Sequence, residues 1–372
     1  MKLTLFFGFL IFFIQSLEGN KQNSTIELVH VFFRHGSRTP EEKDLYPNDI
    51  YGYKTFASVG YGQLTNLGKQ RAYRLGKLLR RQYSDFLGAY NTDVVHATST
   101  DFDRTKMTAL LVLAGLFPPA EEQKWDKSLR WLPIPYHYEK HIDDFVLRRP
   151  NEYCPAYMKE LKRVLASDEV QKVLDDNSNV FEYISKHSGK NMTTLADMFS
   201  IYQTLSAEDY MNLTLPKWTS RVFPGIIHHL AGKQCEFENH NLILKKLNGG
   251  RILSKVIDQM VQKANRTLYP EGRKMYLYSG HENNVINVLS TLNLFVPHVP
   301  KYSAAVFIEL HRLEDNSRAV KIYYAKHISS EPRLQKLPQC EELCPFERFL
   351  EITSPYIPIN YTAECESDAL LD

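Results

Sequence analysis

The segment IELVHVFFRHGSRTP (residues 26–40) carries the strongest structural signal in the chain. Its first eight residues are mostly aliphatic or aromatic, and this is a typical length for a buried β-strand. Arg34, His35 and Gly36 then end the apolar run with polar side chains and a glycine. The pattern predicts a central strand that passes into a loop at His35.

The order of strand, polar loop and helix occurs three times along the chain, which is typical of an α/β fold. After the first strand, Thr65 is placed to cap a helix whose apolar residues share one face. After the second, aspartates are placed to cap a helix that starts near Asp103. We expect the polar loops that follow these strands to meet at one edge of a sheet. The expected strands are residues 26–33, 93–99, 274–280, 304–310 and 319–325.

Between these segments the pattern changes. Residues 118–273 are helix-like, rich in Lys, Glu and Tyr, and contain few runs of strand character. We predict that they form a mostly helical cap. The cap would be inserted into an α/β domain built from residues 25–117 and 274–366.

The balance of charges narrows the range of partners. Lys and Arg total 45 and Asp and Glu total 43, so the formal net charge is +2. Such a chain has no strong electrostatic field that would favour nucleic acid or an anionic membrane as its main partner. Any preference for anions must come from a local site.

The N-terminus has the pattern of a secretory signal peptide (residues 1–19), with Lys2 before an apolar stretch and small or polar residues after it. About 12 apolar residues are too few for a membrane anchor, which needs ~20. The mature protein should therefore be secreted, with delivery to lysosomes as the alternative. Five N-x-[ST] sequons agree with this route: Asn23, Asn191, Asn212, Asn265 and Asn360.

Five cysteines in an exported protein predict two disulfides and one remaining thiol, with 15 possible connectivities. Cys340 and Cys344 are close enough in sequence for a local bridge. Cys154 and Cys365 could then close a loop of about 210 residues, worth roughly 5 kcal/mol in the chain-entropy model. Cys235 would be left as a buried thiol or as a link between chains.

The string Arg34-His35-Gly36-Ser37-Arg38-Thr39-Pro40 fits R-H-G-x-R-x-P, which chance would give about once in ten thousand chains of this length. It is the signature of the histidine acid phosphatases, and the chain resembles that family over residues 25–366. Among its members the chain is most similar to the insect venom and salivary enzymes and to those of the prostatic type. Other matching segments are GQLTNLGKQRAYRLGKLLRRQY (62–83), STDFDRTKMTALLVLAGLFPP (99–119), YSGHENNV (278–285) and CEELCPFERFLE (340–351).

The resemblance implies a phosphoglycerate-mutase-like fold, in which helices flank a central mixed, mostly parallel sheet and a helical cap is inserted. It implies a secreted acid phosphatase that acts on small phosphomonoesters, without a metal or other cofactor, and it implies a homodimer. It also places two disulfides of vertebrate relatives at Cys154 with Cys365 and at Cys340 with Cys344. The chain lacks the third bridge of those relatives.

The resemblance further assigns a site. His35 would be the nucleophile, and Glu282 would be the proton donor where most relatives have Asp. The phosphate-binding residues would be Arg34, Arg38, Arg104 and His281. The chemistry of these residue types agrees, because guanidinium groups bind phosphate oxygens in pairs and their charge keeps a neighbouring imidazole neutral.

The implied mechanism has two steps. His35 attacks phosphorus while Glu282 protonates the leaving oxygen, and Glu282 then activates the water that hydrolyses the phosphohistidine. An acidic pH optimum is expected because Glu282 must begin protonated. No metal is expected, since the arginines and His281 would supply the positive charge and the remaining histidines and cysteines lack zinc spacing.

The sequence leaves other functions open. The main alternative is a secreted binding protein that keeps the phosphatase fold and affinity for phosphate but is catalytically weakened by Glu282. A phosphoglycerate-mutase-like transferase is disfavoured by the signal peptide. A phytase would need a more basic pocket than the composition of the cap suggests.

Overall fold

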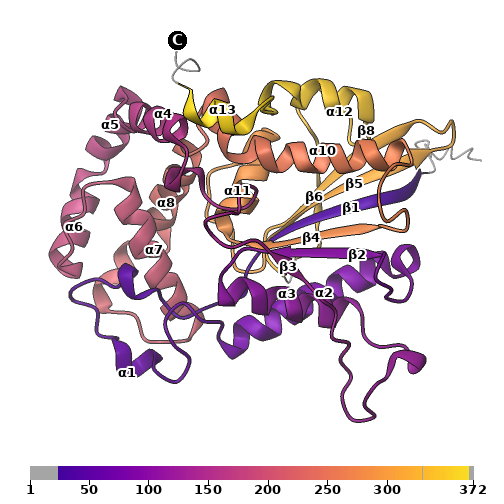
Figure 1. Ribbon diagram of the computed structural model, residues 1–372. Helices are drawn as coiled ribbons and strands as arrows, with labels where there is room; N and C mark the ends of the chain where they lie inside the picture. Colours follow the sequence, from indigo (N-terminus) through magenta and orange to yellow (C-terminus); the bar gives the residue numbers. More distant parts are fainter. Residues whose placement is uncertain (1–23, 329, 368–372) are drawn as a thin grey trace, which may run out of the picture.

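The computed structural model describes residues 24–328 and 330–367, so the predicted signal peptide and Asn23 lie outside the described residues. One β-sheet with strand order β3-β2-β4-β1-β5-β6-β7 forms its centre, and β8 pairs with β6 (Figure 1). Strands β1 to β4 run parallel, whereas β5, β6 and β7 continue the sheet with antiparallel pairs. The predicted fold class, an α/β protein with a mixed sheet flanked by helices, is confirmed.

The strands are β1 (Ser24–Arg34), β2 (Val95–Ser99), β3 (His137–Tyr138), β4 (Met275–Gly280), β5 (Ala305–Leu313), β6 (Arg318–Ala325), β7 (Arg333–Gln335) and β8 (Cys344–Pro345). The α-helices are α1 (Tyr53–Phe56), α2 (Asn66–Leu87), α3 (Asp103–Leu116), α4 (Pro155–Leu165), α5 (Asp168–Asp176), α6 (Ser178–Ser188), α7 (Leu195–Tyr210), α8 (Gly225–Phe237), α9 (Leu242–Lys245), α10 (Arg251–Ala264), α11 (Glu282–Thr291), α12 (Phe346–Thr353) and α13 (Tyr361–Glu366).

Strand β1 is buried on both faces because its alternating side chains enter two separate cores. Val29, Val31 and Phe33 pack with apolar residues of α2 and α3 below the sheet in Figure 1. Leu28 and Phe32 pack on the opposite side with α10, α11 and α12. The loop that follows β1 is therefore held at the centre of the molecule.

The loop after β1 lies directly on the first turn of α2, and two glycines make this approach possible. A Cβ atom on Gly68 would lie 1.9 Å from the carbonyl oxygen of Ser37, and one on Gly36 would lie 2.3 Å from that of Gly68. Any larger side chain at either position would push the loop off the helix. Thr65 caps α2 by accepting a hydrogen bond from the backbone of Gly68, as predicted.

Helix α3 begins at Asp103, as expected, but the predicted aspartate cap is wrong. Phe102 occupies the N-cap position, and no side chain caps the helix. Asp101 instead forms an ion pair with Lys106 at 2.5 Å, one turn into the helix. The Asp101 carboxylate therefore pairs with the lysine side chain and does not cap the backbone N–H groups at the start of α3.

Helices α4 to α9 surround a third apolar core beside the sheet. The range 118–273 predicted as a cap also contains β3, which pairs with β2, and α10, whose Ile252, Val256 and Met260 pack on the sheet. An amphipathic helix has the same sequence pattern whether it covers a sheet or other helices, so the pattern could not separate α10 from the rest. The division of the chain into two domains stays a prediction.

Two disulfides fasten the C-terminal part of the chain. Cys154, at the start of α4, is bonded to Cys365 in α13, and Cys340 is bonded to Cys344. Cys235 is a buried free thiol. In the described part of the chain, no helix is long and apolar enough to cross a bilayer.

Candidate active site

The C-terminal ends of three adjacent parallel strands gather the polar loops of the sequence at one place. In the order β2-β4-β1, these strands lead into Thr100, His281 and His35. Backbone hydrogen bonds join the loops, since the N–H of His35 donates to Gly280 at 2.9 Å and that of Thr100 donates to Ser279 at 3.0 Å. The sheet itself therefore fixes where these three residues begin.

His35 is almost completely buried, with 1% of its surface exposed. Its Nδ1 lies 2.8 Å from the carbonyl oxygen of Gly36. A carbonyl oxygen can only accept, so Nδ1 carries the proton and Nε2 of the neutral ring keeps its lone pair. Nε2 is therefore the ring nitrogen whose lone pair is available.

The surroundings of His35 keep it neutral. Burial lowers its pKa well below the ordinary value of 6.5, and the positive charges of Arg104, Arg34 and Arg38, with His281, lower it further. Each of the four residues expected to bind phosphate thus lies near enough to act electrostatically on His35. The rings of His35 and His281 stand edge to face, with their centroids 5.5 Å apart.

Arg38 and Arg104 leave donors free inside the site. Arg38 donates through Nη1 to the carbonyl oxygen of Thr39 at 2.9 Å, and Arg104 forms an ion pair through Nη2 with Glu41 at 3.0 Å. The Nε atoms of both arginines are buried, and within the described residues neither has a hydrogen-bond partner. Buried donors without partners are costly, and a phosphate group would satisfy them.

His281 is the N-cap residue of α11, where helix N–H groups also favour an anion. Its Nε2 lies 3.1 Å from the hydroxyl oxygen of Thr100, which itself donates to Thr105. The imidazole is therefore the donor in this contact. Burial and the charge of Arg104 keep the pKa of His281 well below 6.5.

Glu282, the first residue of α11, is bound as a carboxylate. Its Oε2 lies 3.1 Å from Nε of Arg34. Burial raises the pKa of Glu282, but Arg34, His281 and Arg38 lower it more, and the pKa falls to about 2. In the free protein Glu282 is therefore a carboxylate, and the sequence could not show that Arg34 pairs with it.

Two contributors to the site were missed by the sequence analysis. Gln203 of α7 contacts both Arg34 and Glu282. The ring of Tyr302 lies 4.2 Å from the Arg34 guanidinium and 5.7 Å from the ring of His35. Neither residue belongs to a motif, and both lie far from His35 in sequence, so only the fold reveals them.

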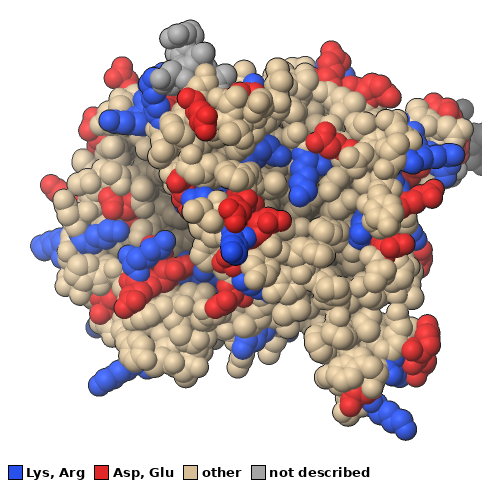
Figure 2. All heavy atoms as spheres, viewed as in Figure 1, with Lys and Arg blue, Asp and Glu red and all other residues tan. Residues whose placement is uncertain are grey.

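A cleft of about 530 Å³ opens beside His35, and Gln203 is among its lining residues. Arg38, Arg104, His281 and Glu282 line its base. Its outer wall has mixed charge, because Arg148 pairs with Glu152 and Arg149 pairs with Glu238. Figure 2 likewise shows Lys and Arg intermixed with Asp and Glu on the visible face.

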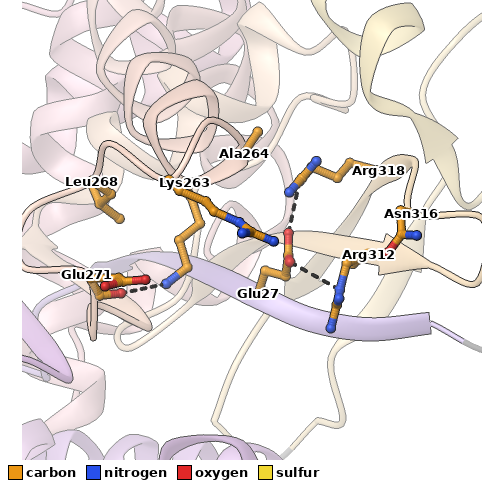
Figure 3. A pocket seen from close by; sticks show the side chains of 9 residues that line it. Glu27, Lys263, Ala264, Leu268, Glu271, Arg312, Asn316 and Arg318 are labelled. Carbon is orange, nitrogen blue, oxygen red and sulfur yellow. Dashed lines mark hydrogen bonds and ion pairs between the residues drawn. The ribbon is translucent and has the colours of Figure 1, made fainter.

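A second cavity of about 530 Å³ lies near the start of β1, at the other end of the sheet (Figure 3). It is also rich in cations, but Glu27 contacts both Arg312, at 3.3 Å, and Arg318, at 2.9 Å. Lys263 donates to backbone carbonyl oxygens there. Glu27 thus neutralises Arg312 and Arg318, whereas the site around His35 has buried Nε donors without partners among the described residues.

Within the described residues, no group of three or more His, Cys, Asp or Glu side chains is placed to hold a metal ion.

The chain was also compared with known proteins. The family model for the histidine phosphatase superfamily (branch 2) matches residues 25–325. The venom acid phosphatase Acph-1 of Apis mellifera is 40% identical over 344 residues, which cover 92% of this chain and 88% of that protein. The prostatic acid phosphatase of Bos taurus is 31% identical over 369 residues, covering 96% and 92% of the two chains.

Among solved structures, the phytase from Citrobacter braakii has a similar fold, with a TM-score of 0.70 at 15% sequence identity, covering 91% of this chain and 99% of that one. This likeness concerns the fold alone. The match of the family model and the identity to the two acid phosphatases show the family as well as the fold. The chain belongs to branch 2 of the histidine phosphatase superfamily.

Proposed function

We propose that this protein is an acid phosphatase that hydrolyses small phosphate monoesters through a phosphohistidine on His35. The observation that carries the proposal is the neutral, buried ring of His35, with Nε2 free to attack and guanidinium groups around it. The resemblance to enzymes named acid phosphatases supports the same reaction. The mixed charge of the cleft wall favours esters with one phosphate over polyphosphorylated substrates.

In the first step, Nε2 of His35 forms a bond to phosphorus as the bond to the ester oxygen breaks. The free donors of Arg38 and Arg104 bind the phosphoryl oxygens and stabilise the charge of the transition state. His281 joins them when its Nε2–H exchanges the Thr100 hydroxyl for a phosphoryl oxygen. Glu282 gives a proton to the leaving oxygen, so that an alcohol departs.

In the second step, water attacks phosphorus and the bond to Nε2 breaks. Glu282, now a carboxylate, takes a proton from that water. Inorganic phosphate leaves, and His35 regains its lone pair. The proton taken up by Glu282 leaves with inorganic phosphate, so the net reaction consumes one water for each ester and Glu282 returns to the carboxylate of the free protein.

The proton that Glu282 donates must arrive with the substrate, because the free carboxyl has a pKa of about 2. A phosphomonoester has a second pKa of about 6, so below that pH it enters as a monoanion. Binding then places an anion beside Arg34, which weakens the hold of Arg34 on Glu282. The shared proton can pass to Glu282, and an acidic optimum follows from the substrate.

The pH dependence of kcat/KM is therefore expected to follow the substrate. For glycerol 2-phosphate, activity should be full below about pH 6 and fall about tenfold per pH unit above it, as the monoanion disappears. For p-nitrophenyl phosphate the decline should be shallower, because its phenolate leaves without a proton. Initial rates of both substrates from pH 4 to 8 check this. An equal decline for both substrates would show that a group of the enzyme sets the pH dependence.

Trapping the intermediate tests the proposed function most directly. Wild-type protein mixed with a ³²P-labelled monoester at pH 5 and quenched within milliseconds should carry about one label per chain. The label should be lost in acid, survive in base and map to the peptide that contains His35. A chelator should leave turnover unchanged. Turnover without a labelled histidine, or a label on another residue, would refute the proposal.

We also propose that the protein is secreted, with lysosomal delivery as the alternative. The predicted signal peptide supports export, although it lies outside the described residues. The four sequon asparagines that the structure describes are exposed, which suits glycosylation: Asn191, Asn212, Asn265 and Asn360. The homodimer implied by the resemblance stays a prediction, to be checked by sedimentation.

A further inference from the structure

Helix α7 contacts the ion pair of Arg34 and Glu282 through Gln203, of which only 4% is exposed. Its Oε1 accepts a hydrogen bond from Nη2 of Arg34 at 2.9 Å, and its Nε2 donates to Oε1 of Glu282 at 3.0 Å. The ion pair between Arg34 Nε and Glu282 Oε2, at 3.1 Å, closes the ring. Three side chains distant in sequence thus fix one another.

Chemistry dictates which way the amide of Gln203 faces. A guanidinium group only donates and a carboxylate only accepts, so the carbonyl end must face Arg34 and the NH₂ end must face Glu282. No aliphatic side chain could make either contact, and an ionised carboxylate could not donate to Glu282. A neutral side chain with both an acceptor and a donor is required at this position.

The helix that carries Gln203 is itself held in place. Thr204 donates to the carbonyl oxygen of Asp44 at 2.8 Å, and Ser200 donates to the Asp44 carboxylate at 3.2 Å. Asp44 belongs to the segment that follows the Arg34–Pro40 motif. The amide of Gln203 is therefore presented from a helix that is hydrogen-bonded to the segment directly after the Arg34–Pro40 motif.

The ring makes the two oxygens of Glu282 different. Oε1 is held by a neutral amide, which a phosphate anion has little power to withdraw. Oε2 is held by the Arg34 cation, which an incoming phosphate also attracts. When substrate binds, the contact at Oε2 weakens first, and that oxygen becomes the one able to take a proton.

We infer that Gln203 is a positioning residue for the proton donor: it holds Oε1 of Glu282 so that Oε2 carries the proton given to the leaving group. This inference rests on the proposed function. Such restraint matters more for Glu282 than it would for Asp, since a Glu side chain has one more rotatable bond. The cap helix then takes part in the chemical step as well as in covering the cleft.

Gln203→Leu should therefore slow the reactions that depend on protonation of the leaving group. For glycerol 2-phosphate, whose alkoxide is a poor leaving group, kcat/KM should fall between about tenfold and a hundredfold. For p-nitrophenyl phosphate, whose phenolate leaves readily without a proton, it should fall no more than about threefold. The ratio of the two kcat/KM values is the readout, because general damage to the site would lower both alike.

Two further variants sharpen the test. Gln203→Glu, when protonated, can still accept from Arg34 and donate to Glu282, so its substrate ratio should approach that of the wild type at pH 4 and depart from it at pH 7. In a Glu282→Gln background, Gln203→Leu should change the rate for glycerol 2-phosphate less than twofold, because no proton donor remains to be positioned.

Gln259→Leu is the matched control. Gln259 is another glutamine with interior contacts, 3.0 Å from both His30 and the hydroxyl of Tyr278, and it lies on α10 away from the cleft. Its replacement should leave the substrate ratio unchanged. Thermal melting of each variant establishes that it is folded.

The outcomes distinguish a failure of the role of Gln203 from a failure of the proposed function. A wild type that forms phosphohistidine, with equal losses for both substrates in Gln203→Leu, overturns the role of Gln203 alone. Multiplicative losses in the double variant overturn it as well. A wild type without phosphohistidine refutes the proposed function, and the inference falls with it.

Discussion

His35→Ala is expected to lower kcat for p-nitrophenyl phosphate at least about 10⁴-fold, because no other group could take the place of the nucleophile. The loss should be confined to chemistry. Arg34, Arg38 and Arg104 remain in the variant, so inorganic phosphate should still bind with an affinity within about tenfold of the wild type. Steady-state rates at pH 5 and phosphate titration by calorimetry measure the two quantities.

The control for this variant is His240→Ala. His240 is a partly exposed histidine of the cap, 3.6 Å from Glu169, and it takes no part in the site. It should keep the wild-type kcat. If His35→Ala retained more than about 1% of the activity, another residue would be the nucleophile. If the wild type were equally inactive yet bound phosphate, the protein would be the binding protein that the sequence left open.

Glu282→Gln is expected to lower kcat for glycerol 2-phosphate by about 10³-fold, within the range for loss of a general acid. The amide keeps the size of the side chain but has no proton to give the leaving oxygen. With p-nitrophenyl phosphate, the first step needs little protonation, whereas hydrolysis of the phosphohistidine still needs a base. A burst of p-nitrophenol of about one equivalent should therefore precede slow turnover in stopped-flow traces.

Glu160→Gln provides the comparison for that variant. Glu160 has 1% of its side chain exposed and pairs with Arg163 in the cap, so the substitution also removes a buried charge. It should cost stability without producing a burst. A Glu282→Gln variant that turned over both substrates at the wild-type rate would remove Glu282 from the mechanism.

Much of the fold follows from patterns within single segments. The strands expected from residues 26–33, 93–99, 274–280, 304–310 and 319–325 correspond to β1, β2, β4, β5 and β6. The short strands β3, β7 and β8, of two or three residues each, were not predicted. So few residues show no periodicity, and such strands exist only because a neighbouring strand offers hydrogen bonds.

The sequence likewise predicted which residues meet in the site but not how their side chains contact one another. Loops after parallel strands meet at one edge, so the order of segments already implied that His35 and His281 lie together. The sequence could not give the charge of Glu282 or the contacts of Gln203. Both depend on distances between side chains that are far apart in the chain, and packing sets those distances.

The sequence by itself determined where the first strand ends, at Arg34 and His35, which residue types the site contains, and the family to which these residues point. Local chemistry suffices for that, since strand periodicity and residue type are properties of short segments. Only the tertiary structure decided the protonation and the side-chain contacts of these residues. It left Nε2 of His35 unprotonated, placed Arg34 on Glu282 and brought Gln203 from the cap to both. These features arise because buried charges must find partners within about 3 Å, wherever in the chain those partners lie.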